Sequence, residues 1–206
     1  MIPVAKSVKD YIAERNTTLP PGLELKILVD MTYYLNARLY MMLKNLAQGS
    51  VLVAIMLTIF LRFGLAKWVM VGLPVCFLGA VLLMPVMGVS INILSLFAFI
   101  MVLGIVVDDA IVIGEAAYTE IENKGGGIDN VVRGAQRVAT PATFGVLTTI
   151  AVFAPFLFSS GPDGVFFKTI ASVVTLCLIF SLIESKLILP AHIAHTKFKP
   201  SRPGSW

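Results

Sequence analysis

One apolar stretch of the sequence constrains the fold more than any other. Residues 93–113 form a run of 21 residues in which Asp108 and Asp109 are the only charged side chains. At about 1.5 Å per residue, a helix of this length spans about 30 Å, which is the thickness of the hydrocarbon core of a bilayer. An ionised carboxylate without a partner is costly in such surroundings, so we interpret the pair as functional.

The composition is typical of a membrane protein that crosses the bilayer several times. Of the 206 residues, 57% are hydrophobic and only 14% are charged, and the mean hydropathy is +0.88. These values exclude an ordinary soluble domain. The net charge of +4 does not indicate nucleic-acid binding, because the basic residues stand at the ends of apolar runs and form no stripe.

The pattern of apolar runs predicts an all-α membrane protein, a bundle of about five transmembrane helices with a small α/β extramembrane piece at its N-terminus. Residues 1–31 are expected to be extracytoplasmic, with a short amphipathic helix and a strand over 23–29. Residues 32–196 are expected to form the bundle, and residues 197–206 a basic tail. The expected spans are about 46–61, 69–87, 93–113, 139–158 and 165–189, with a cytoplasmic amphipathic helix over about 129–137.

The distribution of basic residues predicts the orientation of the bundle. The segments on one side hold nine basic residues: Arg62, Lys67, Lys124, Arg133, Arg137, Lys186, Lys197, Lys199 and Arg202. The short loops on the other side, 88–92 and 159–168, hold only Lys168. By the positive-inside rule, the first side is cytoplasmic. Because the chain starts without an apolar signal segment, we also expect it to be a piece of a longer protein.

The spacing of the two aspartates limits what they can do. Consecutive helical residues point about 100° apart, so Asp108 and Asp109 cannot share a proton as the two aspartates of a protease do. The small residues Gly104, Ala110 and Gly114 are expected to let another helix pack close to the pair.

The charge of the pair raises the question of a counter-ion. No basic residue of another span is expected at the same depth. Either the cationic partner lies outside this chain, or the pair is protonated. We interpret Asp108 and Asp109 as carriers of protons, with the proton as coupling ion and no cofactor; hydrogen bonding between helices is the structural alternative. No metal site is expected, because His192 and His195 lack a third ligand.

The motif Gly104-Ile-Val-Val-Asp108-Asp109-Ala-Ile-Val-Ile-Gly-Glu115 resembles the fourth transmembrane helix of resistance-nodulation-division (RND) transporters. The branch that it resembles is the hydrophobe and multidrug efflux pumps of the AcrB, AcrD and AcrF (acriflavine-resistance) type. Three further motifs resemble the same family: Leu19-Pro-Pro-Gly-Leu, Gly88-Val-Ser-Ile-Asn-Ile-Leu-Ser and Ala139-Thr-Pro. The segment would cover the end of the porter domain and transmembrane helices two to six.

The resemblance implies a multi-pass protein of the bacterial inner membrane that exchanges protons for exported compounds. It implies that the two aspartates carry protons and pair with a lysine in the second half of the transporter. It also implies a homotrimer joined to a periplasmic adaptor and an outer-membrane channel. About one fifth of such a pump is present, so we expect no transport from the chain alone.

Two other functions were weighed against the transporter. A non-pump relative that assists membrane protein translocation also carries an aspartate in this helix, but the doubled aspartate favours a pump. An intramembrane aspartyl protease needs catalytic aspartates on two facing helices. Here both lie on one helix, so we expect no catalytic residues and no enzyme.

Overall fold

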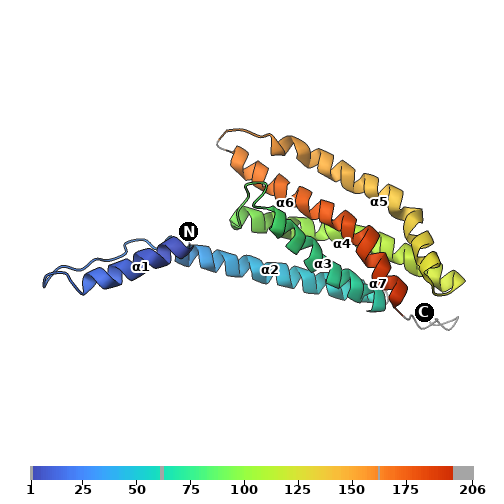
Figure 1. The fold of residues 1–206 in the computed structure, drawn as a ribbon, viewed down its shortest axis with the longest axis horizontal. Coiled ribbons are helices and arrows are strands. Elements are labelled where there is room, and N and C mark those ends of the chain that lie inside the picture. Colours follow the sequence, from blue (N-terminus) through green and yellow to red (C-terminus); the bar gives the residue numbers. More distant parts are fainter. Residues whose placement is uncertain (1, 61–62, 162, 197–206) are drawn as a thin grey trace.

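The computed structural model describes residues 2–60, 63–161 and 163–196, and within these ranges the chain is helical (Figure 1). The elements are α1 (Ile2–Asn16), α2 (Met31–Phe60), α3 (Phe63–Leu83), α4 (Ile93–Lys124), α5 (Ile128–Leu157), α6 (Gly164–Ile183), the π-helical segment η1 (Glu184–Ile188) and α7 (Leu189–His195). The predicted all-α fold class is confirmed.

The strand predicted over residues 23–29 is wrong, because the described part of the chain contains no strand. A strand needs a neighbour to pair its backbone groups. Here the backbone of Leu25 bonds to a side chain: its N–H donates to Asn16 Oδ1 at 2.8 Å, and its carbonyl accepts from Asn16 Nδ2 at 3.1 Å. Residues 2–30 are therefore helix and loop.

Four helical stretches are long and apolar enough to cross a membrane: Gly64–Leu83, Ile93–Lys124, Ile128–Leu157 and Gly164–His195. In α2 the apolar part, Leu43–Met56, is shorter. The chain is thus a multi-pass membrane protein, whereas the five predicted spans and their boundaries stay a prediction.

Two predicted segment boundaries, the one between 129–137 and 139–158 and the end of the span 165–189, lie inside continuous helices. The segment 129–137 and the span 139–158 belong to the single helix α5, which continues through Pro141. The last span continues without a break from α6 through η1 into α7, because Glu184 and Leu189 both keep helical backbone angles.

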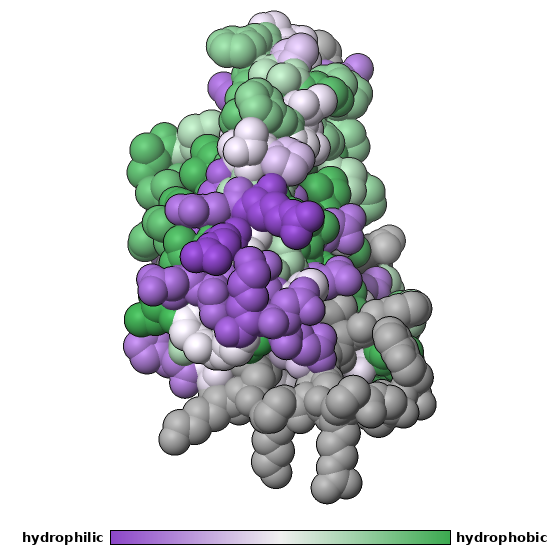
Figure 2. Space-filling model, turned by 90° about the vertical axis from the view of Figure 1, so that its right-hand side faces the viewer, coloured by the Kyte–Doolittle hydropathy of each residue, from purple (hydrophilic) through white to green (hydrophobic). Residues whose placement is uncertain are grey.

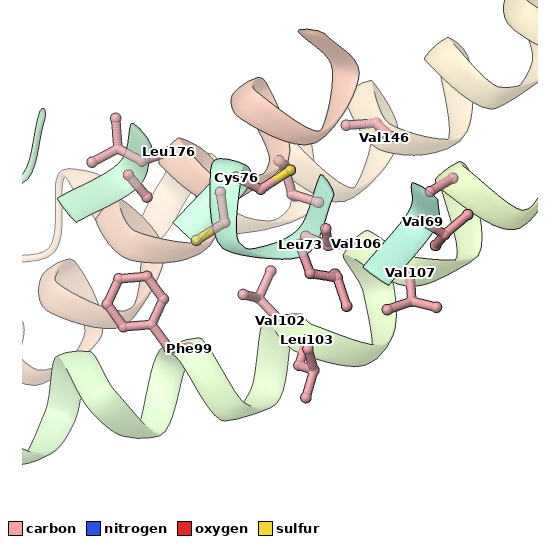
Figure 3. Close-up of a cluster of buried hydrophobic side chains, with 14 of the residues drawn as sticks. Val69, Leu73, Cys76, Phe99, Val102, Leu103, Val106, Val107, Val146 and Leu176 are labelled. Atoms are coloured by element: carbon pink, nitrogen blue, oxygen red, sulfur yellow. The ribbon is translucent and has the colours of Figure 1, made fainter. Parts of the chain in front are cut away.

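The helix α4 lies at the centre of the arrangement and packs against α2, α3, α5 and α6. Figure 3 shows the apolar cluster that these contacts create, with side chains from α3 and α4 meeting Val146 of α5 and Leu176 of α6. The sequence explains this centre, because α4 is apolar around most of its circumference and exposes charge mainly toward its C-terminal end.

The two ends of the bundle differ. Figure 1 shows that the α2–α3 and α4–α5 connections lie at the same end as α7, while α1 projects beyond the opposite end. Figure 2, which faces the first end, shows hydrophilic residues gathered there with hydrophobic residues on the flanks. This arrangement agrees with the predicted cytoplasmic side, although the orientation itself stays a prediction.

Candidate functional site

The two aspartates lie well inside α4 and face different surroundings. Asp108 is exposed, whereas Asp109 is half-buried. The Oδ2 atom of Asp109 is buried and has no hydrogen-bond partner. Since buried polar atoms in proteins are nearly always hydrogen-bonded, this oxygen is the natural place for a proton or a partner group.

The neighbours of Asp109 come from α6 and η1. Ser181 of α6 is fully buried, and its hydroxyl donates to the carbonyl of Val106 at 3.5 Å, one turn before Asp109. The Ser181 hydroxyl, the charge of Lys186 and the charge of Asp108 all act on the Asp109 carboxyl. Asp109 is therefore placed where one hydroxyl and one cation of the same chain can reach it electrostatically.

The small residues near the pair have different roles in the packing. Ala110 is buried, and a Cβ atom on Gly114 would lie 3.0 Å from Cδ1 of Leu65 on α3, so α3 approaches α4 closely there. At Gly104 no described atom lies within 4 Å of the Cβ position. Close packing at Gly104 therefore stays a prediction.

Lys186 is a residue whose importance the sequence did not reveal. It was expected at the cytoplasmic exit, yet it is half-buried and its Nζ donates to Thr143 Oγ1 of α5. It also lines a cavity of about 220 Å³ together with Ile113, Gln136 and Pro190. Ile113 lies one turn beyond Asp109 on α4, so a cation of this chain comes nearer to the pair than we expected.

Glu184, two residues before Lys186, is buried, with only 3% of its surface exposed. It begins η1, and π-helical segments inside α-helices are frequent at functional sites. The apolar residues around Glu184 in the sequence could have signalled this burial, while the π-helical register has no recognised sequence signature.

His192 and His195 lie on α7. Within the described residues there is no group of three His, Cys, Asp or Glu side chains that could hold a metal ion. The ring of His192 instead lies against Trp68 of α3, with the centroids 4.3 Å apart. His192 therefore contributes to packing between α7 and α3, whereas His195 is exposed.

Comparison with known proteins agrees with this arrangement. The model of the AcrB/AcrD/AcrF family matches residues 1–202. The toluene efflux pump membrane transporter TtgE of Pseudomonas putida is 27% identical over 193 residues, which cover 93% of this chain and 18% of that protein. The multidrug resistance protein MdtC of Proteus mirabilis is 32% identical over 196 residues, which cover 95% of this chain and 19% of that protein.

These relatives are transporters and not enzymes, and the chain spans about a fifth of their length. The solvent-resistant pump membrane transporter SrpB of Pseudomonas putida is similar over the same share, at 25% identity. The match of the family model over nearly the whole chain decides the assignment: the chain belongs to the AcrB/AcrD/AcrF family of RND transporters.

Proposed function

We propose that this chain is the transmembrane part of a proton-motive-force-driven efflux transporter for drugs and other hydrophobic compounds. Protons would move in exchange for the exported compound, with Asp108 and Asp109 as their carriers. The observation that supports this proposal best is the unpartnered, buried Oδ2 atom of Asp109 within an apolar helix.

The chemistry of a buried carboxyl supplies the coupling. A protonated Asp109 is neutral and tolerates its apolar surroundings, whereas an ionised one needs a cation nearby. Proton binding and release therefore change which neighbours α4 attracts. Each charge that moves across the membrane also gains about 2.3 kcal/mol per 100 mV of potential. A cycle between the two states can drive relative movement of the helices.

The rest of the machinery follows from the family. In the intact transporter, a basic residue of the second half would pair with the ionised aspartates. We also propose the bacterial inner membrane as the location, and a homotrimer with a periplasmic adaptor and an outer-membrane channel as the assembly. The proton is the coupling ion, and no other cofactor is part of the proposal.

The test uses the full-length transporter in inverted membrane vesicles. Asp108→Asn and Asp109→Asn should each abolish both substrate transport and the accompanying proton flux. Asp163→Asn is the matched control, because Asp163 is exposed before α6 and its side chain makes no capping hydrogen bond. If both substituted pumps kept transport and proton flux, the aspartates would not be the carriers.

A second test addresses the incomplete transporter. Reconstituted alone in liposomes, the 206-residue chain should show no proton flux that substrate stimulates. Flux at the level of the full-length pump would show that the chain is sufficient for transport and that the second half is not required.

A further inference from the structure

Glu184 is the most deeply buried acidic side chain in the described part of the chain. Only 3% of its surface is exposed, and no other Asp, Glu, Lys or Arg is in the buried class among the residues whose side chains the structure describes. It begins η1, which packs against α3, α4, α6 and α7.

The carboxyl group of Glu184 packs directly against Gly72 of α3. A Cβ atom added to Gly72 would lie 2.0 Å from Oε1 of Glu184 and 2.4 Å from its carboxyl carbon. Any larger residue at position 72 would therefore occupy the space of the carboxyl group. Gly72 itself is buried, so the carboxyl is enclosed between α3 and η1.

Among the side chains that the structure describes, no cation is bonded to this carboxyl. Within residues 2–60, 63–161 and 163–196, the structure contains no hydrogen bond or ion pair to the Glu184 side chain. Titratable groups occur on each element that packs against η1: Cys76 on α3, Asp109 on α4, Cys177 on α6 and His192 on α7. Cys76 is close enough for the charge of Glu184 to act on it, and Lys186 on η1 itself is bonded to Thr143 of α5.

An ionised carboxylate in this position would be buried without a counter-charge, which is strongly unfavourable. We propose that Glu184 is a second proton-binding site of the membrane bundle, separate from the aspartate pair, and that its proton keeps η1 packed on Gly72. When the proton leaves, the charge is forced against α3, so η1 must move away. Lys186 lies two residues further along η1 and moves with it.

This proposal goes beyond the transport function and does not depend on it. Infrared spectroscopy of the chain in lipid nanodiscs tests it, because a protonated carboxyl group has a carbonyl stretching band of its own. At neutral pH this band should be present, and isotopic labelling of the glutamate carboxyl groups should shift it. The label leaves the chain unsubstituted, so the result does not depend on the folding of a variant. A protonated aspartate can add a band of its own, which the glutamate label does not move. If no carboxyl band shifted with the glutamate label, the proposal would be overturned.

Substitutions assign the band to one residue. Glu184→Gln should remove the band that the glutamate label shifts, whereas Asp109→Asn should leave that band unchanged. Gly72→Ala should shift or remove it by displacing the carboxyl, while Gly145→Ala, at a helical glycine with no atom within 4 Å of the Cβ position, should not. The band should also decline reversibly as the pH is raised. A band that persisted unchanged up to the pH at which the helices unfold would show a fixed proton and would refute a binding site.

Discussion

Gly134 of α5 packs directly on the backbone of Ala116 in α4. A Cβ atom at Gly134 would lie 2.5 Å from the Ala116 carbonyl oxygen and 2.7 Å from Cα of Ala117. Because the obstacles are backbone atoms, they cannot rotate away, and the two helices must separate if a side chain is added. This contact sets the distance between α4 and α5 in the part of α4 that lies C-terminal to the aspartate pair.

The close contact predicts the effect of Gly134→Ala. We expect the substitution to destabilise the bundle by about 1–3 kcal/mol, the usual cost of overpacking. Unfolding of the chain in detergent micelles, followed by circular dichroism, measures this loss. Gly145→Ala is the control on the same helix, and it should be neutral or stabilise by up to about 1 kcal/mol, because alanine favours helix over glycine. Equal effects of the two substitutions would refute the contact.

A capping box begins α4 and predicts a second effect. The Oδ1 atom of Asn92 accepts from the N–H groups of Leu94 and Ser95 at 2.8 and 3.0 Å, and Asn92 N–H donates to Ser95 Oγ at 2.8 Å. Asn92→Ala should cost about 1 kcal/mol and speed hydrogen exchange at the Leu94 and Ser95 amides. Asn92→Ser keeps an acceptor and should restore most of the protection. Unchanged exchange in the alanine variant would exclude the cap.

The C-terminal end of the bundle is anchored by a contact between residues 128 positions apart. Trp68 Nε1 donates to Thr196 Oγ1 at 2.7 Å, and the same hydroxyl donates to the His192 carbonyl at 2.8 Å. Trp68→Phe and Thr196→Val should each destabilise by about 0.5–1.5 kcal/mol. In a double-mutant cycle, the double variant should lose less than the sum of the two. Strict additivity would show that the bond contributes nothing.

The sequence predicted the helices well because a long apolar run in a membrane has few alternatives to helix. It also predicted different surroundings for Asp108 and Asp109, since adjacent helical residues point apart. The strand over 23–29 failed because pairing depends on a second strand that residue patterns within one segment cannot supply. The apolar neighbours of Glu184 in the sequence are consistent with its burial. The contacts of Glu184 with Gly72 and of Lys186 with Thr143 could not be predicted, because they depend on the π-helical register of η1 and on residues far away in sequence.

The extramembrane piece carries a pH-dependent contact. Lys9 forms an ion pair with Asp30, and Thr32 donates to the same carboxylate. These groups lower the pKa of Asp30 from 3.8 to about 2, with the bond from Lys9 as the main cause. Because the pKa of Asp30 is lower in the folded chain than in the unfolded one, the ion pair with Lys9 stabilises the folded chain above about pH 4. This stabilisation is lost as the pH falls toward 2.

Lys9→Gln tests this contact. The substitution removes the main cause of the shift, so the pKa of Asp30 should rise toward 3.8. Titration of the Asp30 carboxyl by nuclear magnetic resonance measures the change. Lys6→Gln is the control, because it removes a basic residue of the same helix that is not the partner of Asp30. A pKa that stayed near 2 in Lys9→Gln would mean that Lys9 is not the partner.

Lys186 supplies a charge near Asp109 that the family motif alone does not include. Its ammonium group is held by Thr143 and acts on the Asp109 carboxyl. In the full-length transporter, Lys186→Met removes this cation, so ionised Asp109 loses part of its stabilisation. We expect transport to fall on the order of tenfold, which corresponds to about 1.4 kcal/mol. Lys186→Arg keeps the charge and should retain most of the activity.

Thr143→Val separates the charge of Lys186 from its anchoring. It frees the ammonium group from α5 and leaves the cation in place near Asp109. If the charge matters, Thr143→Val should retain more transport than Lys186→Met and should shift the pH profile less. Transport in inverted vesicles across a range of pH measures both effects. An identical loss in Lys186→Met and Lys186→Arg would instead assign Lys186 a packing role at the cavity beside Ile113, and its charge would then have no part in the proton cycle.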